Sequence, residues 1–106
     1  MIVYKFGGTS LANAARMKSV ADLISRDEVQ KVVVLSAASG TTDTLIRLSA
    51  ATPEEGEKII QGMEEQYQRY VTELLEDPDC RQAAERFLEY TFASLREALG
   101  KPLPRD

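Results

Sequence analysis

The hydrophobic and polar positions at the start of the chain predict a strand, a helix and a second strand. Residues 2–6 form a short apolar run, rich in β-branched and aromatic side chains, that two glycines end. Apolar residues recur at helical spacing from Ala14 to Ile24, which predicts an amphipathic helix of about three turns. Residues 32–35 are continuously apolar, a pattern typical of a strand covered on both faces. Together these elements predict a right-handed βαβ unit with parallel strands.

The rest of the chain has only helical periodicity. A short helix is expected over residues 45–48, and residues 52–55, Thr-Pro-Glu-Glu, have the form of a capping box that starts a long helix. The Asp-Pro-Asp sequence at residues 77–79 ends that helix and starts another, because proline suits a first turn and not an interior. Glycine and two prolines in residues 100–104 are expected to end the second helix. Two such helices joined by a short turn predict an αα-hairpin.

These elements predict an α/β fold in which residues 1–52 form the βαβ unit and residues 53–106 form the helical hairpin. The charges divide in the same way: residues 1–52 carry six Lys or Arg and four Asp or Glu, a net of +2, and residues 53–106 carry seven and thirteen, a net of −6. An ordinary sheet has about five or six strands. Two strands therefore predict an incomplete sheet, and we expect both parts to belong to one truncated domain.

Composition excludes several classes of protein. The chain of 106 residues is 43% hydrophobic and 28% charged, as ordinary globular domains are. No apolar run approaches the ~20 residues that span a bilayer, and the N-terminus lacks the pattern of a secretory signal. A net charge of −4 argues against binding to nucleic acid through phosphates. We therefore expect a cytoplasmic protein that binds neither membrane nor nucleic acid.

The residue types also limit the possible chemistry. With no histidine and one cysteine, Cys80, the chain offers no zinc site, no histidine-based triad and no internal disulfide. Cys80 stands beside a predicted helix start, which could lower its pKa, but nothing pairs with it for catalysis. The many carboxylates of the second half are better explained as solvated helix faces than as metal ligands, so no metal site is expected.

The loop after the first strand has the features of a phosphate-binding loop. In open α/β sheets ligands bind at the carboxyl ends of strands, and a following helix start offers free N–H groups to an anion. Gly7 and Gly8 would let the backbone approach a phosphate, and Lys5 could reach it as a point charge. The alternative is a tight turn whose glycines only serve packing, with Lys5 solvated. The loop is neither a Walker A motif nor Gly-x-Gly-x-x-Gly, so both interpretations stay open.

The loop after the second strand is small and polar throughout. Because the ends of parallel strands lie side by side, both loops should open on the same edge of the sheet. Ser36, Ser39 and Gly40, with Thr41 and Thr42, could hold a small polar substrate beside the phosphate loop. Taken singly, each residue is explained as well by a local role, such as capping the short helix.

The two loops together carry a resemblance to a known family. Lys-Phe-Gly-Gly-Thr-Ser at residues 5–10, followed by Val-Leu-Ser-Ala-Ala-Ser-Gly-Thr-Thr-Asp at residues 34–43, resembles the start of aspartate kinases, which belong to the amino acid kinase family. The first string is highly specific, and the second stands at the right distance. The resemblance implies a three-layer α/β/α fold and transfer of the γ-phosphoryl group of ATP to the side-chain carboxylate of L-aspartate. That reaction is the first step toward lysine, threonine and methionine.

The resemblance also implies a role for individual residues. Lys5 matches a catalytic lysine that neutralises charge on the transferring phosphoryl group. The implied nucleotide-binding residues are Lys5, Phe6, Gly7, Gly8, Thr9, Ser10 and Ser36. The implied aspartate-binding residues are Ser39, Gly40 and Thr42. ATP and Mg²⁺ are implied for the complete enzyme, because phosphoryl transfer depends on positioning and charge stabilisation.

The chain departs from the family mainly by its length. The Ser-x-Gly-Glu motif that holds the amino group of the substrate does not occur, nor do the later nucleotide-binding segment and the regulatory ACT domains. We therefore expect an N-terminal segment of an aspartate kinase that is inactive alone and that forms homo-oligomers or self-associates through its incomplete sheet. Two alternatives stay open: a non-catalytic module that docks on a partner, and another amino acid kinase, such as a uridylate or acetylglutamate kinase.

Overall fold

The computed structural model describes residues 1–26, 28–99 and 101, which divide between two compact units, 1–42 and 43–106. The first unit contains β1 (Ile2–Phe6), the 3-10 turn η1 (Gly8–Leu11), α1 (Ala14–Ser25) and β2 (Lys31–Leu35). α2 (Thr41–Ser49) starts in the first unit and continues into the second, which also contains α3 (Pro53–Leu74) and α4 (Pro78–Ala98). The structure thus groups most of α2 with the hairpin, whereas the sequence placed the seam at residue 52. The predicted helix end at Gly100, Pro102 and Pro104 lies outside the described residues.

The two strands pair in parallel, as the sequence predicts. Ile2 lies opposite Lys31 and Phe6 opposite Leu35, so both strands start and end together. The backbone N–H of Ile2 donates to the carbonyl of Gln30 at 3.2 Å, and the N–H of Ser36 donates to the carbonyl of Phe6 at 3.0 Å. These bonds extend the pairing beyond both strand ends, and they bring the following loops together at one edge.

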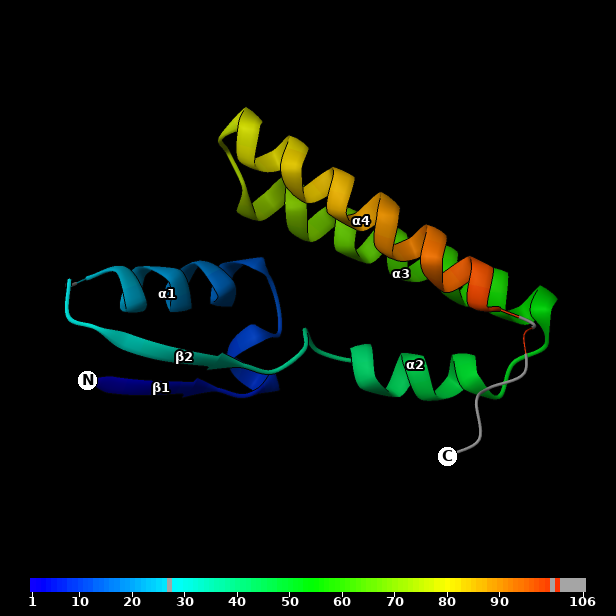
Figure 1. The fold of residues 1–106 in the computed structure, drawn as a ribbon, viewed down its shortest axis with the longest axis horizontal. Helices are drawn as coiled ribbons and strands as arrows, with labels where there is room; N and C mark the ends of the chain where they lie inside the picture. Colours follow the sequence, from blue (N-terminus) through cyan, green and yellow to red (C-terminus); the bar gives the residue numbers. More distant parts are fainter. Residues whose placement is uncertain (27, 100, 102–106) are drawn as a thin grey trace. The chain divides into compact units, whose positions relative to one another are not determined.

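One face of this two-stranded sheet is covered and the other is not. Tyr4, Phe6 and Val33 are half-buried on the face along which α1 lies (Figure 1). On the opposite face the side chains of Val3, Val32 and Val34 are 64%, 43% and 48% exposed. In the described part of the first unit, α1 covers one face of residues 32–35 and the other face stays exposed, as expected for an incomplete sheet. We call Val3, Lys5, Val32 and Val34 the open face of the sheet.

The connection from β1 to α1 contains an additional turn. α1 begins at Ala14, as the helical spacing predicts, and η1 lies between the glycines and this helix. Asn13 caps α1, since its side-chain oxygen accepts the N–H of Arg16 at 2.9 Å. Thr9 and Ser10 lie within η1.

α3 begins at the cap that the sequence predicts, and α4 begins at the Asp-Pro-Asp sequence predicted to start a helix. The N–H of Glu55 donates to the hydroxyl of Thr52 at 3.2 Å, and the N–H of Thr52 donates to the Glu55 carboxylate at 3.3 Å, which completes the capping box of α3. Asp77 caps α4 by accepting the N–H of Cys80 at 3.1 Å. The guanidinium of Arg81 donates to the carbonyls of Thr72 and Leu75, so it satisfies acceptors that the end of α3 leaves without helical partners.

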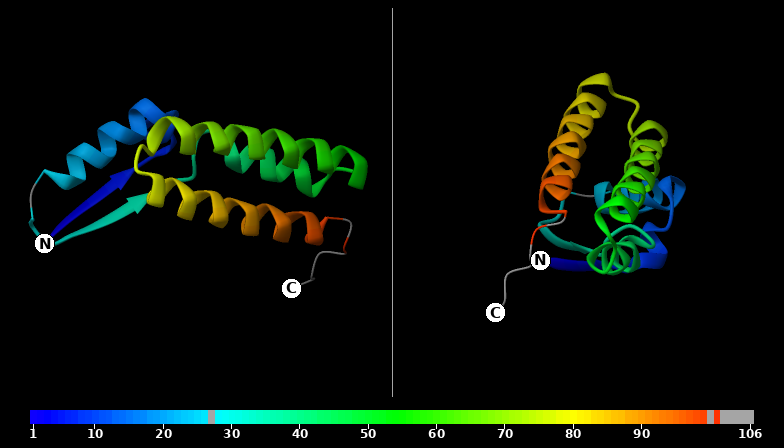
Figure 2. Two further views of the ribbon diagram at one scale, coloured as in Figure 1. Left: turned by 90° about the horizontal axis from the view of Figure 1, so that it is seen from above. Right: turned by 90° about the vertical axis from the view of Figure 1, so that its right-hand side faces the viewer.

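The hairpin encloses the main apolar core of the second unit. Figure 2 shows α3 and α4 side by side along their length. The buried side chains that meet between the helices of this unit are Leu48, Ile60, Met63 and Phe92. Partly buried residues pack around them: Ile59, Tyr67, Leu88, Leu95 and Leu99. The predicted αα-hairpin is therefore confirmed, and α2 joins its core through Leu48.

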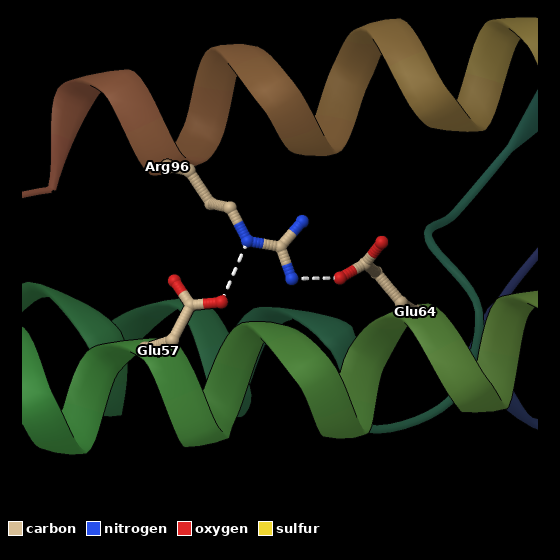
Figure 3. A network of polar contacts seen from close by, with 3 residues as sticks. All are labelled: Glu57, Glu64 and Arg96. Atoms are coloured by element: carbon tan, nitrogen blue, oxygen red, sulfur yellow. Dashed lines mark hydrogen bonds and ion pairs between the residues drawn. The ribbon is translucent and has the colours of Figure 1, made fainter.

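A polar network spans the hairpin beside this core. Arg96 of α4 donates from Nε to Glu57 at 2.7 Å and from Nη2 to Glu64 (Figure 3). The hydrogen bonds to Glu64 and then to Glu57 raise the pKa of Arg96 above its ordinary value. Glu57 and Glu64 occupy the same side of α3, so one guanidinium ties two turns of that helix to α4. Solvent reaches all three side chains, which limits the contribution of such a pair to about 1 kcal/mol or less.

None of the helices in the described ranges combines the length and the apolar character needed to cross a bilayer. The hairpin helices are amphipathic instead. Their apolar sides meet in the core, and their outer sides carry the charges.

Two phenylalanines of α4 test this description of the hairpin. The side chain of Phe92 is 5% exposed in the core, whereas that of Phe87 is 68% exposed. We expect Phe92→Ala to lower the free energy of unfolding by about 3–4 kcal/mol and Phe87→Ala to change it by less than about 0.5 kcal/mol. Urea unfolding followed by circular dichroism measures both, and similar losses for the two variants would contradict the packing described.

Candidate functional site

The two loops that the sequence singled out meet at the carboxyl edge of the sheet. β1 and β2 end at paired positions, Phe6 opposite Leu35. The hydrogen bond from Ser36 N–H to the Phe6 carbonyl then joins the first residue of the second loop to the end of the first strand. The predicted juxtaposition of residues 5–10 with residues 36–42 is therefore present within the first unit.

Neither the backbone conformation nor the packing of the first unit requires glycine at positions 7 and 8. Gly7 has φ −84° and ψ −178°, and Gly8 has no positive φ either, so any residue could adopt these conformations. A Cβ built on Gly7 or on Gly8 would have no other atom within 4 Å. The interpretation that the glycines serve a tight turn or packing thus finds no support inside the unit. The space above both residues is open.

The loop also presents backbone donors. The N–H of Ser10 is used internally, since it donates to the Gly7 carbonyl at 3.1 Å. Within the described part of the chain, the N–H groups of Gly8 and Thr9 have no acceptor. Because an N–H group without a partner has to be satisfied by solvent or by a ligand, this loop can accept an anion.

Lys5 and Phe6 lie on opposite faces of β1. Lys5 is exposed on the open face, where Val34 is its register partner, and no carboxylate pairs with it among the described residues. Phe6 instead lines a groove with Val20 and Leu23 of α1. The side chain and the carbonyl of Phe6 both have protein partners, so Phe6 can contribute to a site through the loop that it anchors.

The second loop turns sharply into α2. Gly40 has φ +81°, in the left-handed region that favours glycine, and the N–H of Thr41 donates to the carbonyl of Ala38 at 3.1 Å. Ser36, Ser39 and Thr42 are exposed. Thr41 and Thr42 form the first turn of α2. The hydroxyls of Ser36 and Ser39 in the second loop, and that of Thr42 in the first turn of α2, are thus exposed to solvent.

Arg16 contacts the glycine loop, although the sequence did not single it out. Its Nη1 donates to the carbonyl of Thr9 at 2.8 Å. The signal that could have revealed it is its place in the first turn of the helix that follows the loop, one helical turn after the cap Asn13.

The second unit offers less chemistry. Cys80 is exposed, but the hydrogen bond with Asp77, followed by the charge of Asp77, raises the pKa of the thiol. The suggestion that the helix start lowers this pKa is therefore wrong. The same contact, through the Cys80 side chain first and its backbone second, lowers the pKa of Asp77. Nowhere in residues 1–26, 28–99 and 101 do three acidic, histidine or cysteine side chains gather to hold a metal ion.

Comparisons with known proteins match this arrangement to one family. A family model described as the amino acid kinase family matches residues 1–103. An aspartokinase of Chlamydia pneumoniae is 41% identical over 73 residues, which are 69% of this chain and 16% of that protein. The chain therefore spans less than a fifth of the length of that relative.

Solved structures of related proteins have the same fold. Escherichia coli aspartokinase III in complex with lysine and aspartate matches 98% of this chain with a TM-score of 0.73 and 32% identity. Aspartokinase III of the same organism in complex with aspartate and ADP matches 92% with a TM-score of 0.69 and 35% identity. The chain covers 24% and 22% of these structures. The predicted α/β fold with an incomplete sheet is thus confirmed.

The two loop glycines can be distinguished by substitution. We expect Gly8→Ala to leave the free energy of unfolding unchanged or to raise it by up to about 1 kcal/mol, because the new methyl meets nothing and the unfolded chain loses freedom. Gly40→Ala should lower it by about 1–2 kcal/mol, because φ +81° strains an L-residue. Urea unfolding of both variants measures the difference. A clear loss for Gly8→Ala would mean that this glycine is needed by the fold.

Proposed function

The chain belongs to the amino acid kinase family, and on that premise we propose that it carries the nucleotide-binding loops of an aspartate kinase. The proposed reaction transfers the γ-phosphoryl group of ATP to a side-chain carboxylate oxygen of L-aspartate, which forms 4-phospho-L-aspartate and releases ADP. It is the reaction that opens the biosynthesis of lysine, threonine and methionine. The similarity to an aspartokinase solved with aspartate and ADP supports this choice.

The observation that carries the proposal is the open glycine loop. Two adjacent glycines without positive φ or internal contacts cost backbone entropy and give the unit nothing in return. Close approach by a ligand explains them, since a Cβ at either position would occupy the space in which a phosphate lies. The unpaired N–H groups of Gly8 and Thr9 are then the donors to that phosphate.

The side chains of the first loop complete the proposed phosphate site. We assign to Lys5 the catalytic role of neutralising charge on the γ-phosphoryl group during transfer. In that step the bond from phosphorus to the ADP oxygen breaks, and a bond to a carboxylate oxygen of aspartate forms. The proposed nucleotide-binding residues are Lys5, Phe6, Gly7, Gly8, Thr9, Ser10 and Ser36, with Phe6 acting as the anchor of the loop.

The second loop is proposed to hold aspartate. Its exposed hydroxyls can donate to a carboxylate, and the left-handed Gly40 turns the chain into α2 beside the edge where both strands end. The proposed aspartate-binding residues are Ser39, Gly40 and Thr42. Such a pairing would bring the acceptor carboxylate and the γ-phosphoryl group close together, which is the main requirement of phosphoryl transfer.

Mg²⁺ is not assigned to residues of this chain. The loops carry hydroxyls, amides and a lysine, and hard divalent cations prefer carboxylate and phosphate oxygens. In the proposed reaction Mg²⁺ supplies charge neutralisation as part of the nucleotide complex. The proposed role of the loop residues is to bind and orient the phosphates of that complex.

The chain contributes one part of the proposed active site. It spans 16% of the aspartokinase of Chlamydia pneumoniae and 24% and 22% of the two solved structures of aspartokinase III, and the sheet formed by the described residues has two strands. We propose that residues beyond this length are needed for turnover and that the 106-residue chain forms no aspartyl phosphate alone. The cytoplasm is the proposed location, because ATP is available there and a lone thiol stays reduced.

A graft tests the catalytic proposal. This chain replaces the matching segment of E. coli aspartokinase III, and aspartyl phosphate formation is measured as hydroxamate. We expect the graft to be active and Lys5→Ala to lower kcat by roughly 100-fold or more, because a preorganised charge at the phosphoryl group is lost.

The exposed Lys18 of α1 provides the control for charge. Lys18→Ala removes the same charge from the same unit without touching the loop, so the graft should keep its activity. If Lys5→Ala were as active as Lys18→Ala, the assignment of Lys5 would be wrong. Both variants also have to unfold at the same urea concentration as the parent graft.

We also propose that the isolated chain self-associates through its sheet. Among the residues that the structure describes, β1 and β2 pair only with each other, so each leaves one edge open, and the valines of the open face are 43% to 64% exposed. Pairing of two copies would satisfy backbone groups at an edge and remove apolar surface from water.

Substitution on the open face tests this association. We expect Val32→Glu to shift the 106-residue chain toward monomer, because the carboxylate would be buried between copies, while Ala15→Glu on the exposed side of α1 leaves association unchanged. Size-exclusion chromatography with light scattering over a range of concentrations gives the mass. A monomer at every concentration for the unsubstituted chain would contradict the proposal.

A further inference from the structure

The side chain of Arg16 holds the peptide group that closes the glycine loop, and we infer that Arg16 positions this loop for phosphate binding. The inference rests on the proposed function. Arg16 lies outside both loops. Its proposed role is to hold the backbone of the glycine loop and not to contact the reacting atoms.

The peptide group between Thr9 and Ser10 is held at both ends. Its carbonyl oxygen accepts a hydrogen bond from Arg16 Nη1 at 2.8 Å, and its N–H donates to the carbonyl of Gly7 at 3.1 Å. A peptide group is planar, so two bonds at opposite ends fix its orientation. The neighbouring peptide carries the N–H of Thr9. Holding one peptide therefore limits rotation of the next, and with it the direction of the N–H groups that Gly8 and Thr9 present.

Arg16 is itself held in place by the start of α1. Its backbone N–H donates to the side chain of Asn13 at 2.9 Å, which fixes the first turn of the helix. Arg16 also lines the groove between β1 and α1 together with Ser10 and Val20. The guanidinium thus reaches the loop from a rigid element, and the loop gains a support that its own short turn does not provide.

The positive charge of Arg16, like its hydrogen bond to the loop, favours the binding of an anion. No carboxylate forms an ion pair with Arg16 among the residues that the structure describes. A guanidinium group is a cation, so a full positive charge lies beside the loop. Together with Lys5 it favours a multiply charged anion at the free N–H groups of Gly8 and Thr9.

Residue-resolved hydrogen exchange of the 106-residue chain tests the positioning. In Arg16→Met the amide of Ser10 should exchange roughly fivefold to tenfold faster, because one of the two bonds that hold its peptide is lost. Arg16→Lys should restore most of the protection. Lys18→Met removes a charge from the same helix without contact to the loop and should leave Ser10 unchanged. Retained protection within α1 shows that the helix is intact.

Titration with tripolyphosphate, followed through the amide signals of Gly8 and Thr9, tests the consequence for binding. We expect these signals to shift and the Kd to rise about threefold to tenfold in Arg16→Met, with Lys18→Met close to the unsubstituted chain. Unchanged exchange at Ser10 overturns the positioning. Faster exchange with an unchanged Kd overturns the link to phosphate. If Arg16→Lys restores the Kd but not the protection, charge alone acts and the positioning is again wrong.

The two measurements separate this inference from the proposed function. Hydrogen exchange at Ser10 needs no ligand, so it judges the contact between Arg16 and the loop by itself. If the unsubstituted chain shows no shift at Gly8 and Thr9 with tripolyphosphate, the glycine loop is not a phosphate site. That result contradicts the proposed function and the inference that rests on it, whatever the exchange at Ser10.

Discussion

The parallel pairing of β1 with β2 is the constraint on which the candidate site depends. The register sets Phe6 opposite Leu35, and the bond from Ser36 N–H to the Phe6 carbonyl carries the pairing one step past the strands. A shift of β1 by one residue would turn Lys5 toward α1 and Phe6 toward the open face. The same alternation that places Lys5 on the open face places Phe6 against α1, so one strand supplies both the exposed charge and the anchor of the loop.

The second unit is stabilised independently of this pairing. Its core forms around Ile60 and Phe92, and Arg96 connects Glu57 with Glu64 across the hairpin. None of these contacts involves a residue of the first unit. The two units therefore differ in how completely they bury apolar side chains. The hairpin buries the apolar sides of its helices, whereas the sheet leaves the valines of its open face exposed to water.

Sequence patterns predicted those elements whose causes are local. The capping box at Thr52 and Glu55 and the helix start at the Asp-Pro-Asp sequence of residues 77–79 depend on residues within one turn, and both are present as expected. Local patterns do not determine features that depend on contacts elsewhere in space. The apolar run at residues 32–35 is typical of a strand covered on both faces, but the cover depends on the other elements of the sheet, and α1 covers one face. The 3-10 turn at residues 8–11 arises from the bond of Ser10 to Gly7 together with the contact of Arg16 to Thr9, which periodicity does not reveal.

We place the phosphates of the nucleotide in the open space above Gly7 and Gly8. A crystal structure of the active graft with ADP and aspartate would locate them. We expect a phosphate oxygen within about 3 Å of the amide nitrogen of Gly8 or Thr9, with the Lys5 ammonium group facing the same phosphates. Protein atoms packed against both glycines, with the phosphates bound at another edge of the sheet, would contradict it.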